Sequence, residues 1–136
     1  MTNEGKKLGI AIMCVDWRLH QKEVRAAEQI RDALQVDVVD VMAMPGPDGF
    51  LKSGQESERD ALVKGLKLLI GAHHPASVAL VGHYTCAANP VDEAVHDEDA
   101  KETAEFLKKE TGFDAIRAFS AVHNSDTDWS LKEVSV

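Results

Sequence analysis

Short apolar runs rich in β-branched residues alternate with amphipathic segments along this 136-residue chain, and this alternation constrains the fold more than any other feature. The runs suit strands buried on both faces, and the segments between them place apolar side chains on one helical face. The expected strands cover residues 8–14, 36–44, 77–82 and 116–122. The expected helices cover residues 19–34, 57–73 and 91–111.

Local signals mark the ends of these elements. Residues 45–49 (PGPDG) break the chain after the second expected strand. Ser57 and Asp60 approximate a capping box for the next helix, and Gly112 is a good stop for the last one. The tail, residues 129–134, can add a short antiparallel edge strand.

Strands that alternate with helices are joined by right-handed crossovers, which gives a mostly parallel sheet with helices on both faces. We therefore predict an α/β fold with a four-stranded sheet of order 2-1-3-4, in a single domain that spans residues 1–136. Sites in such sheets collect beyond the carboxyl ends of the strands, where the strand order reverses. The ends of the first and third strands are therefore the places to search for chemistry.

Charge and hydropathy exclude several classes of protein. Lys and Arg number 15 against 23 Asp and Glu, and the resulting net charge of −8 argues against a nucleic-acid or anionic-membrane partner. Apolar stretches are far shorter than the roughly 20 residues of a membrane span, and the N-terminus has no signal-peptide core. We therefore predict a cytoplasmic protein, in which two cysteines are no disulfide framework.

The two expected strands of interest run directly into chemically active residues. The first ends in residues 14–18 (CVDWR) and the third in residues 83–86 (HYTC). If these strands are neighbours, Cys14, His83 and Cys86 converge on one small volume. Two thiolates and one imidazole are a good zinc set, and three protein ligands leave a fourth position open, as in catalytic zinc sites.

Two charged residues accompany the cysteine of the first strand. On an extended segment Cys14 and Asp16 share a side, so Asp16 would lie beside the metal. Arg18 can pair with Asp16 and keep its carboxylate ionised and oriented. Taken singly these features have ordinary explanations, because a lone strand cysteine is more often a small buried hydrophobe and an Asp-x-Arg is usually a surface pair. Their combination at two strand ends is far more specific.

The pattern Cys14-x-Asp16-x-Arg18 followed by His83-x-x-Cys86 resembles the signature of the β-class carbonic anhydrases, and the similarity extends over most of the chain. The resemblance implies a zinc lyase that hydrates carbon dioxide to bicarbonate through zinc-bound hydroxide. Cys14, His83 and Cys86 would be the ligands of one Zn²⁺ per chain, with Asp16 and Arg18 as the catalytic dyad. It also implies a homodimer or a larger homo-oligomer.

The chain departs from the family pattern in two places. Trp17 stands where the family usually has a small residue, so we expect it to narrow the pocket or redirect the loop. Ala87 stands where the family prefers glycine, which makes a close backbone approach to the metal less assured. Residues 43–46 (AMPG) correspond to the family's Ala-Gly-Gly turn. Trp17, Met44 and Tyr84 are candidates for a small apolar substrate slot.

Other functions stay open at this point. One alternative is a zinc-binding protein that keeps the ligands without hydrating carbon dioxide, and another is a hydrolase of carbon disulfide or carbonyl sulfide. Thiol redox chemistry is weaker because the cysteines lack a C-x-x-C spacing, and nucleotide binding has no motif. The remaining histidines receive no role: His20, His73, His74, His96 and His123.

Overall fold

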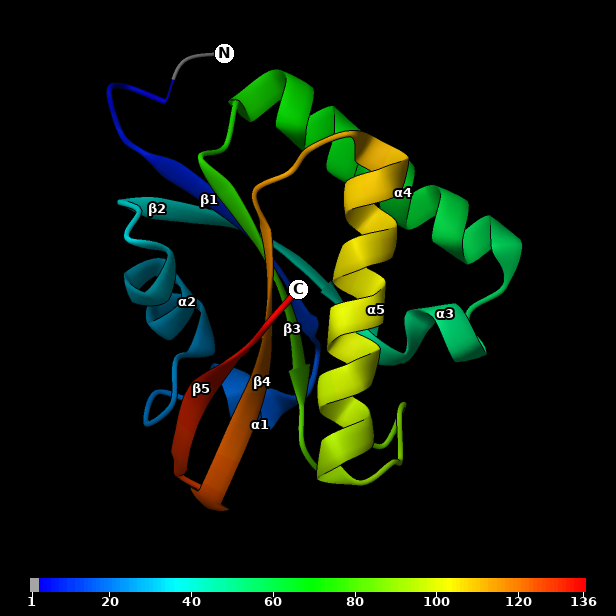
Figure 1. Ribbon diagram of the computed structural model, residues 1–136. Coiled ribbons are helices and arrows are strands. Elements are labelled where there is room, and N and C mark those ends of the chain that lie inside the picture. The colour runs from blue at the N-terminus through cyan, green and yellow to red at the C-terminus, as the bar shows by residue number, and fades with distance from the viewer. Residues whose placement is uncertain (1–2) are drawn as a thin grey trace.

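A computed structural model describes residues 3–136 and shows one twisted sheet with helices packed against it (Figure 1). The strands are β1 (Leu8–Cys14), β2 (Val38–Met44), β3 (Ser77–His83), β4 (Ile116–Ser125) and β5 (Asp128–Val134). Their order is β2-β1-β3-β4-β5; the first four are parallel, and β5 runs antiparallel to β4. The predicted order and the antiparallel tail are confirmed, although β2 begins two residues later than expected and β3 and β4 end later.

The helical elements are α1 (Trp17–His20), α2 (Ala26–Leu34), η1 (Pro47–Gly49), α3 (Phe50–Ser53), α4 (Glu56–His73) and α5 (Glu93–Thr111). Helix α2 covers one face of the sheet, and α4 and α5 cover the other (Figure 1). The prediction of helices on both faces is therefore correct. No helix within residues 3–136 has the length and apolar character needed to cross a membrane.

Strand β1 is covered on both faces, which explains why its sequence is apolar without interruption. Ala11 and Met13 pack on the α2 side, whereas Ile10 and Ile12 pack on the side of α4 and α5. Successive side chains of a strand point to opposite faces, so a strand covered on both sides needs apolar residues at every position. All seven residues of β1 are buried.

The predicted helix 19–34 is wrong over its first third. The structure has a short α1 that ends at His20 and is capped by Gln21, and α2 begins only after Arg25, whose φ of 46° lies in the left-handed region. The side-chain amide of Gln21 donates hydrogen bonds to the carbonyls of Arg18 and Asp126. Because Asp126 belongs to the turn between β4 and β5, a contact distant in sequence ends α1 where helical periodicity alone would continue it.

The start of α4 also differs from the prediction. The helix begins at Glu56, and the capping box is formed by Gln55 and Glu58 rather than by Ser57 and Asp60. The preceding short α3 is capped by Gly54, and only Gln55 separates this cap from α4, which therefore begins one residue earlier than the Ser-x-x-Asp pattern indicates. At the other end of the chain Gly112 caps α5 in a left-handed conformation, as predicted.

Candidate metal centre

Three candidate ligands lie together at the carboxyl edge of the sheet. Strands β1 and β3 are parallel neighbours, so Cys14 and His83, their last residues, reach the same edge, and Cys86 follows in the next turn. Their ligand atoms all lie within 4.8 Å of one another, and the two Sγ atoms are 4.0 Å apart. The three residues are 4%, 1% and 2% exposed. The structure thus brings together the three residues that the sequence predicted as metal ligands.

The imidazole of His83 is oriented for a bond through one nitrogen. Its Nδ1 lies 2.9 Å from the carbonyl oxygen of Tyr84 and donates to it. Its Nε2 is buried and has no hydrogen-bond partner among residues 3–136. Buried polar atoms are rarely left unpaired, and histidines that bind metals commonly donate their second nitrogen to a carbonyl. Two sulfurs beside this free nitrogen fit a zinc ion in both number and chemistry.

The two thiols form a hydrogen-bonded pair. The hydrogen bond from the Cys86 thiol lowers the pKa of Cys14 to about 3, against the opposing effect of burial. The same hydrogen bond and burial raise the pKa of Cys86. The backbone N–H of Gly46 lies 3.4 Å from the Cys14 sulfur and further favours the thiolate. The pair thus holds one proton, which a metal ion would displace on binding.

Asp16 and Arg18 form a two-point ion pair beside the sulfurs. The Nη2 and Nε atoms of Arg18 lie 2.7 Å and 3.1 Å from the two carboxylate oxygens. Hydrogen bonds from Arg18 lower the pKa of Asp16 to about 2. The Asp16 Oδ2 lies 3.8 Å from Nε2 of His83. An ionised carboxylate that can only accept hydrogen bonds therefore stands next to the candidate ligands.

A pocket of about 550 Å³ opens over this centre. It is lined by Cys14, Val15, Asp16, Trp17, Arg18, Pro45, Cys86, Ala87 and Ala88. Trp17 is 69% exposed, so its ring stands at the wall of the pocket and does not fill it. Met44 lines a neighbouring groove, and Tyr84 is buried with its hydroxyl donating to Asp97. Of the three residues predicted for an apolar slot, only Trp17 lines this pocket.

Two residues beside the centre, Gly46 and Trp129, received no role there from the sequence. Gly46 has a φ of 52°, and its place in a Pro-Gly turn was the signal for that conformation. Trp129 packs its ring edge-on against His83, with the ring centres 6.0 Å apart, and Arg18 lies 5.3 Å from the same indole. Nothing in the sequence around Trp129 indicates this contact, because the residue lies at the far end of the chain.

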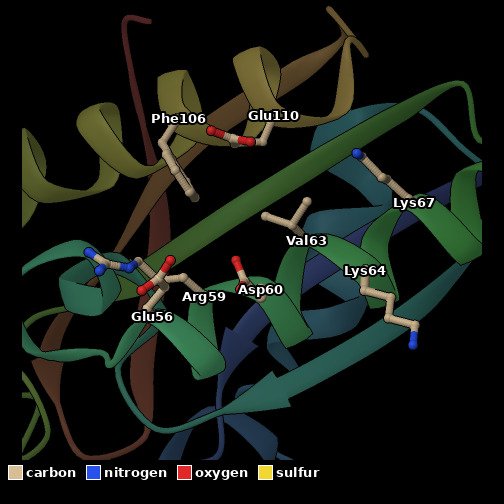
Figure 2. A pocket seen from close by; sticks show the side chains of 8 residues that line it. All are labelled: Glu56, Arg59, Asp60, Val63, Lys64, Lys67, Phe106 and Glu110. Atoms are coloured by element: carbon tan, nitrogen blue, oxygen red, sulfur yellow. The ribbon is translucent and has the colours of Figure 1, made fainter.

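A second pocket lies away from the centre, between α4 and α5 (Figure 2). It has a volume of about 640 Å³, and Phe106 extends into it from α5 toward α4. Its lining contains charged side chains of both signs, but no cysteine or histidine. None of the predicted site residues contributes to it, so the metal centre is the better candidate for a functional site.

Family comparison agrees with this geometry. A family described as "Putative carbonic anhydrase" matches residues 4–134. The chain belongs to this carbonic anhydrase family. The match covers both segments of the centre and confirms the resemblance drawn from Cys14-x-Asp16-x-Arg18 and His83-x-x-Cys86. No curated protein matches the chain. Family membership supports a carbonic anhydrase-like enzyme that acts on a small molecule.

Proposed function

We propose that the protein is a zinc-dependent lyase that catalyses the reversible hydration of carbon dioxide to bicarbonate. One observation supports this proposal above all: two sulfurs and an unpaired, buried imidazole nitrogen converge within 4.8 Å beside a carboxylate. Such a cluster is a good zinc donor set, and the family match supports carbon dioxide hydration as its reaction.

Cys14, His83 and Cys86 would hold one Zn²⁺ per chain. The pocket reaches both sulfurs, so the fourth coordination position would face solvent and substrate. When bound, zinc supplies Lewis acidity that brings the pKa of a coordinated water toward neutrality. The Tyr84 carbonyl and the Gly46 N–H would hold His83 and Cys14 in position.

Asp16 and Arg18 would act as the dyad that orients the reacting oxygen. Asp16 is ionised over the working pH range because Arg18 lowers its pKa to about 2. It therefore accepts a hydrogen bond from any O–H group beside the ligands, which turns a lone pair of that oxygen toward the pocket. Arg18 fixes the carboxylate through bonds of 2.7 Å and 3.1 Å and restricts its rotation.

The walls of the pocket suit a small uncharged substrate. Val15, Trp17 and Ala87 are exposed apolar residues along its rim. Carbon dioxide has no charge and needs little binding energy, so a shallow apolar wall is sufficient. Carbonyl sulfide and carbon disulfide have the same linear shape, which makes them the competing substrates for an assay.

We further propose that the protein acts in the cytoplasm as a homodimer or larger homo-oligomer. A reducing compartment keeps both thiols free for metal. Val15 and Trp17 together expose an apolar surface at the rim, which a second subunit would cover. Sedimentation velocity of the zinc-loaded protein measures the oligomeric state, and a monomer at micromolar concentration would contradict this part of the proposal.

Metal analysis combined with stopped-flow carbon dioxide hydration tests the function. We expect about one zinc per chain in the purified protein. Arg18→Ala should retain zinc and lose about a hundredfold in turnover, because the dyad carboxylate is no longer held. Lys22→Ala, an exposed change on the segment between α1 and α2, serves as the control and should leave turnover unchanged.

Three results would contradict parts of this proposal. Zinc without turnover of any of the three substrates would favour the non-catalytic alternative. Turnover confined to carbonyl sulfide or carbon disulfide would indicate a hydrolase. Unchanged turnover in Arg18→Ala would remove the dyad from the mechanism.

A further inference from the structure

Thr85 has an unusual backbone conformation between two candidate ligands. It lies in the turn that joins His83 to Cys86, and its φ is 61°. This value falls in the left-handed region, which a β-branched residue adopts only under strain. Strain of this kind persists where surrounding contacts hold it, and it concentrates at functional sites.

Two of the contacts that hold Thr85 come from Arg18. The Nη1 atom of Arg18 donates to the Thr85 hydroxyl at 3.2 Å, and its Nη2 atom donates to the Thr85 carbonyl at 3.1 Å. In this left-handed conformation, the hydroxyl and the carbonyl of Thr85 both face the guanidinium of Arg18. Since Arg18 also clamps Asp16 through Nε and Nη2, its guanidinium is held from two sides.

The hydroxyl of Thr85 also contacts the carbonyl that orients His83. Its single proton goes to the carbonyl of Tyr84 at 2.6 Å, and this carbonyl also accepts the Nδ1–H of His83. The hydroxyl oxygen is then left with two acceptor sites. Arg18 donates to one of them, and Nε2 of His123 lies 3.2 Å from the hydroxyl oxygen.

We propose that Thr85 is a positioning residue that joins the Asp16–Arg18 dyad to the carbonyl that orients His83. It touches neither substrate nor metal; it acts by fixing the plane of the Arg18 guanidinium and, through it, the carboxylate of Asp16. This role rests on the proposed function, because it gives the dyad its geometry for that reaction. The proposal also implies that the left-handed strain of Thr85 lowers the stability of the folded state.

The arginine side chains themselves provide the test. Exchange of the Nε–H proton with water, measured by ¹H–¹⁵N NMR on the full chain, reports how firmly each guanidinium is held. The Arg18 signal is assigned by its absence in Arg18→Lys. Arg117 is an internal control, because it clamps Glu133 in the same two-point way, with Nε–Oε2 and Nη2–Oε1 distances of 2.8 Å and 2.7 Å.

Three variants at one position separate the hydroxyl from the strain. Thr85→Val removes the hydroxyl and keeps the β-branch, Thr85→Gly removes the hydroxyl and relieves the left-handed strain, and Thr85→Ser keeps the hydroxyl. We expect Arg18 exchange to accelerate about tenfold in the valine and glycine variants, the effect of losing one charge-assisted hydrogen bond. The serine variant should stay close to wild type, and Arg117 should not change.

Glycine gives the sharpest contrast with a purely structural role. Thr85→Gly should raise the melting temperature and still accelerate Arg18 exchange, whereas a purely structural role would couple faster exchange to a lower melting temperature. Unchanged Arg18 exchange in both Thr85→Val and Thr85→Gly would overturn the proposal, as would equal acceleration in Thr85→Ser.

Turnover gives an independent second measurement. Thr85→Val should lower carbon dioxide hydration about tenfold in the wild-type background and should have no further effect in Arg18→Ala, since both changes act through the same guanidinium. Additive losses would contradict this. The NMR result does not depend on turnover, so an inactive protein with a firmly held Arg18 would remove the proposed function and leave the positioning role of Thr85 standing.

Discussion

Gly82, near the end of β3, allows the backbone of this strand to lie close to the side chain of Asp48. A Cβ atom built at Gly82, directly before His83, would lie 2.3 Å from Oδ2 of Asp48. Asp48 is itself buried, and the same oxygen is 2.7 Å from Nδ1 of His96 on α5. Glycine at this position therefore lets a buried Asp–His pair lie directly against the backbone that carries the candidate ligand.

We predict that Gly82→Ala destabilises the protein by about 3 kcal/mol, because the added methyl group must displace a buried, hydrogen-bonded carboxylate. Gly71→Ala is the matched control. Nothing lies within 4 Å of its Cβ position in α4, so it should stabilise the helix by roughly 0.5–1 kcal/mol. Urea unfolding followed by tryptophan fluorescence measures the stability of both variants. Equal urea midpoints would show that a methyl group at position 82 does not clash with Asp48.

At the scale of elements, one polar cluster ties α5 to the sheet. The carboxylate of Asp97 on α5 accepts hydrogen bonds from Ser120 on β4, at 2.7 Å, and from Lys132 on β5. The Tyr84 hydroxyl donates to the same carboxylate at 3.2 Å. Burial raises the pKa of Asp97, but the hydrogen bonds from Lys132 and Ser120 outweigh it and leave this pKa below its usual value. The cluster therefore stabilises the fold only while Asp97 is ionised.

Lys132→Met should lower the urea midpoint at pH 7, with a loss that depends on pH. Because the folded pKa of Asp97 is depressed, its contribution is fully present above its unfolded pKa, about 4, and disappears as pH falls through the lower folded value. The difference between wild type and variant should therefore be constant near neutrality and shrink below about pH 4. Lys22→Met, at an exposed position, controls for the lost charge. A difference that grows on acidification would contradict this linkage.

At the scale of the whole molecule, the proposed metal couples segments that lie far apart in the chain. Cys14 and Cys86 are separated by 72 residues, and the ion would bridge β1 to the turn after β3. A ligand that binds only the folded state stabilises it by mass action. Metal removal should therefore affect global unfolding and not only activity.

We predict that stripping zinc with a chelator lowers the melting temperature and that adding zinc back restores it. A free zinc concentration of 100 times the dissociation constant would increase the free energy of unfolding by about 2.7 kcal/mol. Cys86→Ser, which removes one sulfur ligand, should unfold at the same temperature with and without chelator. Circular dichroism and tryptophan fluorescence should give one coincident transition if residues 1–136 form the single domain predicted from the sequence. A wild-type protein that is insensitive to chelator would contradict the metal centre.

Features that depend on neighbouring residues were predictable from the order of the amino acids. The all-apolar β1, the stop at Gly112 and the alternation of strands with helices follow from periods of two and 3.6 residues and from capping chemistry. The sheet order then placed Cys14 and His83 at one edge. Their roles as ligands, with those of Asp16 and Arg18, stay predictions.

Features that depend on residues distant in the chain became visible only in the folded molecule. Gln21 ends α1 by bonding to the β4–β5 turn, and Trp129 packs on His83 from the last strand. The left-handed Thr85 is held by a guanidinium 67 positions away. Local propensity cannot encode such contacts, because their free energy exists only once the whole sheet has brought the partners together.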